Sequence, residues 1–554
     1  MRLLRLRSPV AGALAVAALV AVAALVIALQ ATRSAHAAST VPCASGTTVQ
    51  TADGPVCGIN TNGVNEWLGI PYAAPPVGSL RWKPPQAPTP WTTTLQATSF
   101  GSECVQGIAS SPAGSEDCLY LNVWRPADSS TNLPVLVHIH GGGFFNGSGN
   151  GDNSLLASTG HEVVVSMNYR LNIFGFLADT ALGANSGDYG LQDQQAALRW
   201  VQSNVSAFGG NPKSVTIYGE SAGGSSVCDQ IASPTAKGLF ERGISVSGEY
   251  NTLLGTQEQT PRTPEDLESQ DCKSALPTAA QADAAGKNFA AAVGCGAGTA
   301  NVAACLQALP LAVIEKAAWT PGDGYQYGGQ GTVAPTINGT TLTMTLRQAL
   351  KSGHVNHVRV IAGTDRDEDL VGTATSAAQY QSLVDTQYGI YASQVLARYP
   401  LSRFDSPGLA WRTVAADSDT VCPSLQTDRD LAARMPTYGY EIDDNDIPPY
   451  TAAGPNVVAP GASHVGAWFL TPVTPALDAN QQVLQNQELA FVTAFARTGN
   501  PNSNGKIPPW PRFDPSNNPS EMSLQPADDS EVVTAAEVSA QHHCAFWDRI
   551  APNS

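Results

Sequence analysis

The chain has 554 residues, of which 43% are hydrophobic and 14% are charged, and its formal net charge is −17. This composition is typical of a protein with a large folded core and excludes a disordered chain. The strong negative charge argues against binding to nucleic acid or to anionic lipid surfaces.

The first 37 residues are typical of an export signal. Arg2, Arg5 and Arg7 precede an apolar run over residues 10–29, and the sequence A-H-A at 35–37 has the small-x-small pattern of a cleavage site. The apolar run is long enough to span a bilayer, so a retained N-terminal anchor is the alternative. Cleavage would remove four arginines and no acid, which changes the formal net charge from −17 to −21. We therefore expect a secreted protein that contacts a membrane only if this segment is retained.

The remaining chain alternates between strand-like and helix-like stretches. We expect strands at 116–124, 133–140, 162–169, 215–218, 358–362 and 438–442, and helices at 196–201, 279–293, 299–308, 488–497 and 531–550. The proline-rich residues 68–78 are expected to form a surface loop. The alternation predicts an α/β fold with a central, mostly parallel sheet flanked by helices. No internal repeat or linker divides residues 38–554, so a single domain is expected, with an alanine-rich helical insertion at about 255–331 that covers a pocket.

A candidate nucleophile follows the strand expected at 215–218. Residues 219–223 read G-E-S-A-G and fit G-x-S-x-G, with small residues after them that suit the start of a helix. A glycine two residues before the serine and another two residues after it let the strand and the helix on either side of a tight turn approach each other. Such a turn lifts the hydroxyl of Ser221 above the sheet and directs a helix N-terminus at the reaction centre. The pattern alone is equally compatible with a glycine-rich connection.

A glycine-rich loop follows the buried strand expected at 133–140. Gly141, Gly142 and Gly143 allow the backbone to direct its N–H groups outward with no side chain in the way. H-G-G-G is a known oxyanion-hole motif of hydrolases, so we interpret this loop as an oxyanion hole rather than a simple turn.

A serine nucleophile needs a base, and the base needs an acid that orients it. In hydrolases with a nucleophile elbow the chain order is serine, acid, histidine. The acidic run after the strand at 358–362 supplies Asp367 or Glu368. Among the later histidines, His464 lies on a loop after a strand in the correct order. The others fit less well, because two precede the acid and two adjoin a cysteine in an expected helix: His354, His357, His542 and His543.

Ten cysteines in an exported chain favour disulfides, and none has zinc-ligand spacing, so we expect neither a metal nor another cofactor. Proximity suggests the pairs Cys43–Cys57, Cys104–Cys118 and Cys295–Cys305. Four cysteines are then left without an assigned partner: Cys228, Cys272, Cys422 and Cys544.

From about residue 45 to residue 548 the chain resembles the type B carboxylesterase family, the cholinesterase-like branch of the α/β-hydrolases. The stretches that carry the resemblance are GIPYAAPPVGSLRW (69–82), SEDCLYLNV (115–123), HGGGF (140–144), NYRLNIFGFL (168–177), GLQDQQAALRWV (190–201) and FGGNPKSVTIYGESAG (208–223). The resemblance implies the α/β-hydrolase fold with helical insertions over the active site. The tryptophan that binds choline in cholinesterases has no counterpart that can be placed, so choline esters are not implied.

The resemblance also implies roles for individual residues. Ser221 matches the nucleophile, His464 matches the base, and the family's acid is the Glu of an Asp-Glu pair, which selects Glu368 over Asp367. The oxyanion donors would be the backbone N–H groups of Gly142, Gly143 and Ala222. The family supports Cys104–Cys118, Cys295–Cys305 and a long-range Cys422–Cys544 bridge, which leaves Cys228–Cys272 and Cys43–Cys57.

The sequence therefore predicts a secreted serine carboxylesterase that hydrolyses small-molecule carboxylic esters through an acyl-enzyme, with no obligatory protein partner. Two alternatives remain within the enzyme class, a lipase and an esterase specialised for plant phenolic or toxin esters. A catalytically silent adhesion or binding protein is the alternative from another class, because relatives with this fold have lost their triad.

Overall fold

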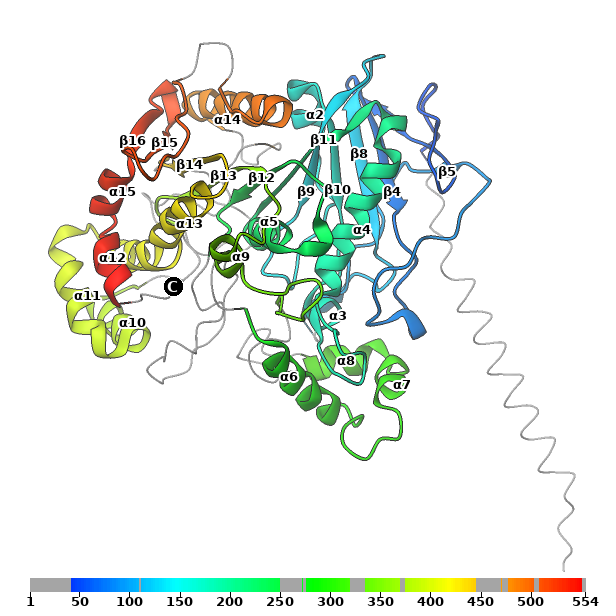
Figure 1. Ribbon diagram of the computed structural model, residues 1–554, viewed down its shortest axis with the longest axis horizontal. Helices are drawn as coiled ribbons and strands as arrows, with labels where there is room; N and C mark the ends of the chain where they lie inside the picture. Colours follow the sequence, from blue (N-terminus) through cyan, green and yellow to red (C-terminus); the bar gives the residue numbers. More distant parts are fainter. Residues whose placement is uncertain are drawn as a thin grey trace, which may run out of the picture. The chain divides into compact units, whose positions relative to one another are not determined.

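The computed structural model describes residues 41–108, 111–249, 272, 276–318, 334–368, 374–444, 470, 477–502 and 508–550. Residues Cys43–Ser554 belong to one compact unit (Figure 1). The expected export signal and His464 both lie outside the described residues. In the part of the chain that is described, no helix has both the length and the apolar character that crossing a membrane requires.

A central sheet organises this unit. Among the described residues it has eleven strands in the order β16-β15-β14-β13-β12-β11-β9-β10-β8-β4-β3. Their bounds are β3 Ile59–Thr61, β4 Val64–Pro71, β8 Tyr120–Pro126, β9 Leu133–Ile139, β10 Val163–Met167, β11 Gly210–Glu220, β12 Arg242–Val246, β13 Arg359–Asp365, β14 Thr437–Ile442, β15 Ser520–Leu524 and β16 Glu531–Thr534. The strands from β10 to β15 run parallel, and the strands at both edges are antiparallel. Minor strands form two further pieces, β1 Val49–Gln50 with β2 Pro55–Cys57 and β5 Leu95–Gln96, and the hairpin of β6 Gln106–Ile108 with β7 Ser111–Ala113.

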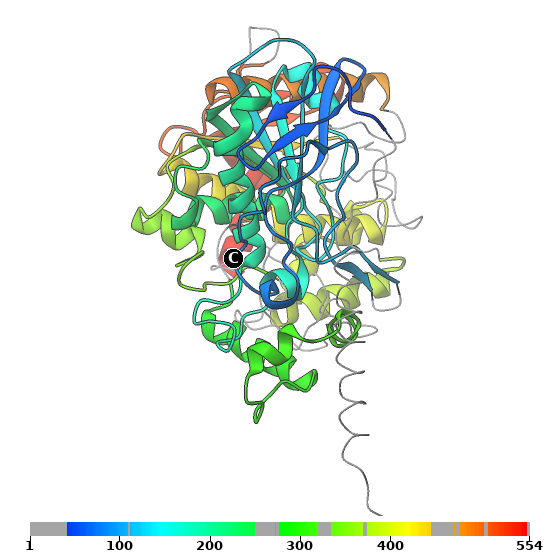
Figure 2. The same cartoon turned by 90° about the vertical axis from the view of Figure 1, so that its right-hand side faces the viewer.

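Helices follow most of the strands. The α-helices near the sheet are α2 Ser154–Gly160, α3 Asn172–Phe176, α4 Tyr189–Asn204, α5 Ala222–Ala232, α9 Leu346–Ser352, α13 Cys422–Ala432 and α14 Ala479–Thr498. The others are α6 Ala279–Ala292, α7 Val302–Gln307, α8 Leu311–Ala318, α10 Ala377–Tyr388, α11 Ala392–Arg398, α12 Pro407–Ala416, α15 Ala535–Gln541 and α16 Cys544–Ile550. Helices α6 to α8 gather at one end of the unit in both Figure 1 and Figure 2.

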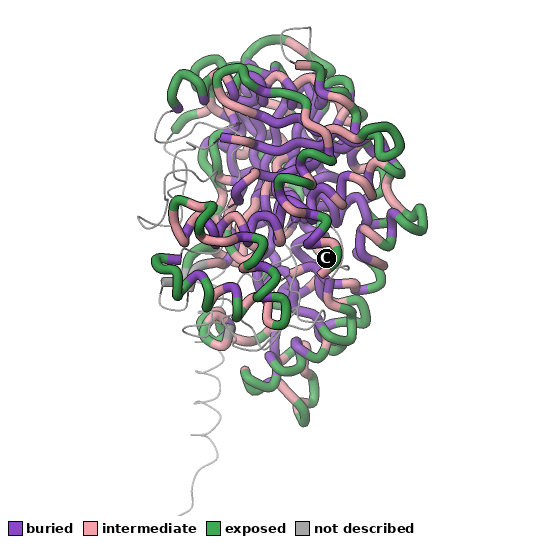
Figure 3. Tube along the Cα trace, turned by 90° about the vertical axis from the view of Figure 1, so that its left-hand side faces the viewer, coloured by how far each residue is buried: buried purple, intermediate pink, exposed green. Residues whose placement is uncertain are grey.

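The sheet is buried on both faces because its central strands are apolar at successive positions. In β9, Val135, Val137 and Ile139 pack in one cluster with residues of α4 and α5, whereas Leu136 packs in a second cluster with residues of α14 and α2. Side chains alternate between the two faces of a strand. Successive apolar residues therefore require helices that pack on both faces of the sheet. Figure 3 shows the result, with buried residues gathered inside the unit and exposed residues mainly at its periphery.

The sequence located most of these elements. The expected strands at 133–140, 162–169, 215–218, 358–362 and 438–442 correspond to β9, β10, β11, β13 and β14. The expected α/β fold, with a central, mostly parallel sheet flanked by helices, is confirmed.

Three local expectations were wrong. Leu68 to Pro71 belong to β4, because this strand pairs with β8 near the edge of the sheet, where a terminal proline is tolerated. Glu531–Thr534 form strand β16 rather than the start of a helix, since they complete the other edge against β15. In the expected strand 116–124, pairing starts only at Tyr120. Strand β12 was not anticipated.

Disulfides join all ten cysteines in pairs: Cys43–Cys57, Cys104–Cys118, Cys228–Cys272, Cys295–Cys305 and Cys422–Cys544. These are the pairs expected from the sequence. The last one closes the largest loop, with a separation of 122 residues, and ties α13 to α16. Closing a long loop restricts the unfolded chain and so favours the folded state.

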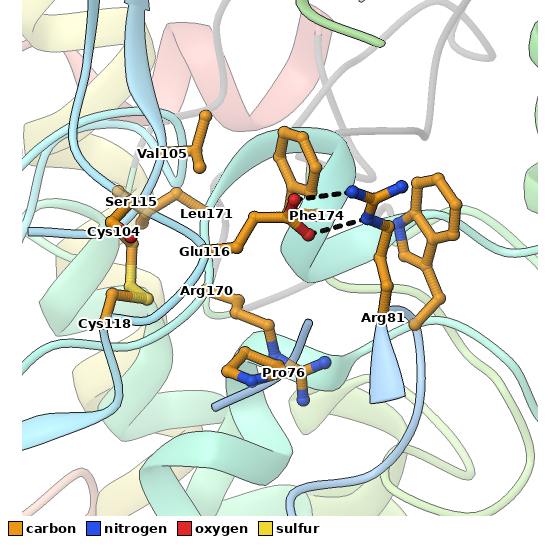
Figure 4. A pocket seen from close by; sticks show the side chains of 11 residues that line it. Pro76, Arg81, Cys104, Val105, Ser115, Glu116, Cys118, Arg170, Leu171 and Phe174 are labelled. Atoms are coloured by element: carbon orange, nitrogen blue, oxygen red, sulfur yellow. Dashed lines mark hydrogen bonds and ion pairs between the residues drawn. A yellow bond between two sulfur atoms is a disulfide. The ribbon is translucent and has the colours of Figure 1, made fainter. Parts of the chain in front are cut away.

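A fork of hydrogen bonds anchors the proline-rich segment after β4. Nε and Nη2 of Arg81 each donate to a carboxylate oxygen of Glu116 at 2.6 Å, as Figure 4 shows. Nη1 of Arg81 donates to the carbonyl of Leu309 at 2.7 Å. Bidentate pairing of this kind is strong and directional, so Arg81 connects the start of the domain to the loop between α7 and α8.

Asp188, at the N-terminus of α4, is buried with a positive φ of 54°. Its Oδ1 accepts a hydrogen bond from the N–H of Thr336 at 2.8 Å, but burial raises the pKa of Asp188 to about 8. Because the pKa of Asp188 is higher in the folded than in the unfolded state, the protonated carboxyl favours folding. Its contribution to the free energy of unfolding is fully present below about pH 3.8 and is lost as the pH rises through about 8.

We therefore expect Asp188→Asn to stabilise the protein more at pH 8.5 than at pH 5. Asparagine keeps the acceptor and tolerates positive φ, but it carries no charge to desolvate. The Tm of the variant should exceed that of the wild type by roughly 2–5 °C at pH 8.5, because about 1–3 kcal/mol is recovered in a large domain. Calorimetry at the two pH values checks this, and a Tm difference independent of pH would contradict it.

Candidate active site

Ser221 occupies a sharp turn between β11 and α5. Its φ of 56° and ψ of −124° lie outside the regions that most residues adopt, and its side chain is mostly buried. The N–H of Ser221 donates to the carbonyl of Val246 at the end of β12, at 2.9 Å. Backbone strain of this kind persists only where the surroundings enforce it, and it is a feature of the nucleophile elbow.

The glycines around Ser221 are required by close packing. A Cβ atom on Gly223 would lie 2.1 Å from the carbonyl oxygen of Ile139 in β9. A Cβ atom on Gly219 would lie 2.5 Å from the same oxygen and 2.5 Å from the backbone carbon of Gly223. Both distances are far below van der Waals contact, so the G-x-S-x-G pattern here meets a steric requirement of the turn.

The glycine loop after β9 lies directly against this turn. A Cβ atom on Gly141 would lie 3.2 Å from Cβ of Ser221 and 2.7 Å from Oε2 of Glu220. The next two residues, Gly142 and Gly143, have positive φ values of 102° and 63°. The structure thus brings the expected oxyanion loop and the expected nucleophile side by side.

Glu368 lies shortly after β13, and its side chain is buried. Its Oε2 accepts hydrogen bonds from the hydroxyl of Ser247 at 2.8 Å and from the hydroxyl of Thr364 at 3.2 Å. Asp367, the other candidate acid, is instead paired with Nε of Arg366 at 2.8 Å. The two neighbouring acids therefore have different environments, and it is Glu368 that accepts a hydrogen bond from the hydroxyl following β12.

The register of the sheet places Glu368 relative to Ser221. Glu220 is opposite Val246, and Val246 is opposite Gly363, so β11, β12 and β13 end in one row. Ser221 and Ser247 are the next residues along their strands. Two strand spacings separate β11 from β13, about 10 Å. An imidazole ring that makes a hydrogen bond at each end spans about 8 Å, which is comparable with this separation of the strands.

Two further groups near the turn have shifted pKa values. Burial and the neighbouring charge of Glu368 raise the pKa of Glu220 to about 8. Burial lowers the pKa of His140 to about 3, and its ring stacks on Tyr169 with centroids 4.3 Å apart. His140 is therefore neutral at physiological pH, and its Nδ1 forms a hydrogen bond with the carbonyl of Gly141 at 2.8 Å.

The other candidate histidines take structural or surface positions. His354 and His357 are exposed. His542 is buried, with Nδ1 2.5 Å from Oδ1 of Asp417 and Nε2 2.9 Å from Oε1 of Glu441. Burial alone would lower the pKa of His542, but the two carboxylates raise it well above its usual value. This charged histidine pairs with acids that differ from the candidate triad acid.

Ser247 is a residue of the site that the sequence reasoning missed. It has a positive φ of 43° and follows β12, which no expected element covered. The stretch R-G-I-S-V at 242–246 is a short buried strand, and reading it as one would have placed Ser247 at the same sheet edge as Ser221.

In the described part of the chain, two hollows and one set of metal-ligand candidates lie away from Ser221. The cavity in Figure 4 has a volume of about 10 Å³, room for about one water molecule, and is lined by Pro76, Arg81, Glu116, Arg170 and Phe174, among others. A larger hollow of about 470 Å³ lies against α13, α15 and α16. Within the described ranges, one set of three metal-ligand types lies close together, Cys228, Glu249 and Cys272, but its two sulfurs are joined in a disulfide.

The comparisons with known proteins point to one family. A sequence model of the carboxylesterase family matches residues 45–547. Carboxylesterase 1F of Mus musculus is 32% identical over 525 residues, which cover 84% of this chain and 88% of that enzyme. The para-nitrobenzyl esterase of Bacillus subtilis (strain 168) is 49% identical over 226 residues, but this match spans only 39% of the chain and 46% of that enzyme.

A solved structure shows the same architecture. The structure of a PNB esterase superimposes with a TM-score of 0.71 and 28% sequence identity, covering 90% of this chain and 99% of that chain.

Proposed function

The chain belongs to the carboxylesterase family and is a carboxylic ester hydrolase, and we propose that Ser221, His464 and Glu368 form its catalytic triad. The substrate is a small-molecule ester. The observation that carries this proposal is the elbow itself: a serine with positive φ that lies against a glycine loop, with a buried carboxylate at the same sheet edge.

In the first half of the reaction, Oγ of Ser221 attacks the ester carbonyl carbon while His464 takes its proton. His464 then gives this proton to the leaving alcohol as the bond between the carbonyl carbon and the alcohol oxygen breaks, and an acyl-enzyme remains. Water attacks the acyl-enzyme by the same route and releases the acid. Glu368 orients His464 and stabilises its charged form, while Ser247 and Thr364 hold the carboxylate of Glu368 in place.

The negative charge on the carbonyl oxygen is received by backbone N–H groups of Gly142, Gly143 and Ala222. Ala222 is the first residue of α5, so its N–H is not used within the helix and points along the positive end of the helix dipole. The loss of one such donor typically costs about 10²–10³ in turnover, so the glycine loop matters alongside the triad.

Covalent labelling tests this proposal without a mutation. A fluorophosphonate probe should stop hydrolysis of p-nitrophenyl butyrate in proportion to its incorporation, and peptide mass spectrometry should find the label on Ser221. An active enzyme labelled at another residue would refute the assignment of the nucleophile.

The range of substrates is tested with p-nitrophenyl esters of increasing acyl length. An esterase prefers dissolved short-chain esters, so we expect acetate and butyrate to be hydrolysed faster than long-chain esters. A rate that rises sharply when a long-chain ester forms droplets would identify a lipase instead.

We also propose that the enzyme is exported. Five disulfides support this proposal, because such bonds persist mainly in oxidising compartments. Mass spectrometry of protein from the culture medium should find an N-terminus at residue 38.

A further inference from the structure

The loop that carries the expected oxyanion donors has an unusual backbone. Gly142, Gly143, Phe144 and Gly147 all have positive φ, between 60° and 102°. This conformation costs Phe144 free energy because it has a side chain, whereas the glycine residues are free to adopt other backbone conformations. Because oxyanion donors act only when they already point at the oxyanion, this loop requires support from outside itself.

The amide of Gln106 provides such support. Its Oε1 accepts a hydrogen bond from the N–H of Gly147 at 2.9 Å, and its Nε2 donates to the carbonyl of Gly147 at 3.0 Å. One side chain therefore satisfies both backbone groups of one residue, which fixes the position and the rotation of that peptide segment. Gln106 is partly buried and begins the β6–β7 hairpin, far from the loop in sequence.

Gly147 transmits this constraint to the donors. A Cβ atom on Gly147 would lie 2.5 Å from the carbonyl oxygen of Gly141, so the end of the loop folds back on its beginning. Inside the turn, the N–H groups of Phe145 and Asn146 donate to the carbonyl of Gly142 at 3.1 and 3.0 Å. A movement of Gly147 would therefore displace the peptide groups of Gly142 and Gly143.

The segment around Gln106 is itself firmly held. Cys104 is bonded to Cys118, and the side-chain amide of Asn172 donates to the carbonyl of Val105 at 2.7 Å. The N–H of Asn172 also donates to the carbonyl of Phe144, at 2.6 Å. The hairpin base and the glycine loop are thus joined at both Gly147 and Phe144.

We propose that Gln106 is a positioning residue for the oxyanion hole, because its amide holds Gly147 and thereby keeps the N–H groups of Gly142 and Gly143 directed at the reacting carbonyl. This inference rests on the proposed function, since it assumes that these N–H groups receive the oxyanion. Gln106 itself does not contact the substrate.

The test replaces Gln106 by glutamate, which has the same shape but presents an acceptor to the carbonyl of Gly147. We expect kcat to fall about 10- to 100-fold, approaching the loss of an oxyanion donor, with KM within about threefold. The affinity for a trifluoromethyl ketone, whose adduct with a serine resembles the tetrahedral intermediate, should fall by the same factor as kcat/KM. Rates are expressed per active site counted with the fluorophosphonate, so that partial unfolding does not imitate the effect.

The pH dependence separates positioning from general damage. At low pH the introduced carboxyl becomes protonated and regains a donor for Gly147. Carboxyl groups titrate near pH 4–5, and the nearby Glu103 shifts this titration upward. We expect the ratio of variant to wild-type kcat to rise as the pH falls from 8 to 5. A ratio that does not change with pH, together with a wild-type affinity for the ketone, would overturn the proposal.

Gln202→Glu is the matched control. Gln202 is also partly buried and donates to a backbone carbonyl, that of Leu239 at 2.9 Å, but it lies on α4. Its substitution should leave kcat per active site unchanged. If the wild type hydrolyses esters and is labelled on Ser221 while Gln106→Glu keeps full kcat, only the role of Gln106 fails. If the wild type neither hydrolyses esters nor takes the label on Ser221, the proposed function fails.

Discussion

Replacement of Ser221 by alanine is expected to lower kcat for p-nitrophenyl butyrate by about 10⁶, because members of a catalytic triad act as a unit and the nucleophile forms the covalent bond. Residual activity of the order of 10³–10⁴ above the uncatalysed rate should remain from the oxyanion donors and substrate binding. Labelling by the fluorophosphonate should disappear entirely.

The fold should survive this substitution. Alanine and serine both carry a Cβ atom, so the positive φ at position 221 costs both residues about the same. We therefore expect a Tm within about 3 °C of the wild type. A steady-state assay and a thermal melt on the same preparation check the two expectations.

Ser225→Ala serves as the control for Ser221→Ala. Ser225 is buried one turn further along α5, where its hydroxyl donates to the carbonyl of Gly248 at 2.7 Å. Its loss should lower stability slightly and leave kcat per active site intact. If both variants lost activity equally, disturbance of α5 would explain the result and Ser221 would no longer be the nucleophile.

Replacement of Glu368 by glutamine is expected to lower kcat by about 10³–10⁴ with little change in KM. The amide has the same shape, but it removes the charge that stabilises the protonated base, and it favours the wrong tautomer of that base. In the wild type, the hydroxyls of Ser247 and Thr364 donate to Oε2 of Glu368. In the variant they should donate to the amide oxygen and keep the side chain in the same place. The effect is therefore electrostatic rather than a result of collapse.

Asp367→Asn is the matched control for the acid. This neighbour is also buried, but its carboxylate pairs with Arg366. We expect Asp367→Asn to reduce stability, because it breaks a largely buried ion pair. We expect kcat to stay within about fivefold, because this pair takes no part in the proposed proton transfer. The opposite pattern, with Asp367→Asn inactive and Glu368→Gln active, would reverse the assignment of the acid.

The part of the site that depends on local pattern could be predicted from the sequence. Glycines at 219 and 223 have identifiable spacing, and the structure explains it through the contact of both positions with Ile139. The chain order of Ser221 and Glu368 could also be predicted, since each residue follows a strand that its own apolar residues identify. His464 stays a prediction, because it lies outside the described residues.

The edges of the sheet were harder to predict for a physical reason. A central strand is recognised by its own buried apolar run, whereas an edge strand such as β16 has only four residues, all exposed or half-buried, and is stabilised mainly by pairing with β15. That pairing is not encoded in the four residues of β16. The short buried strand β12 was missed for a related reason, since five residues are too few to show a period.

The sequence by itself thus determined the class of fold, the nucleophile turn, the glycine loop and the acidic pair, because each is a local pattern imposed by backbone geometry. Only the tertiary structure decided what surrounds them. It brought Ser247 to the carboxylate of Glu368 and Gln106 to the end of the glycine loop. These contacts join residues 121 and 41 positions apart, and no property of either residue alone indicates its partner. They arise because parallel strands end in one row and a disulfide-bonded segment packs beside it.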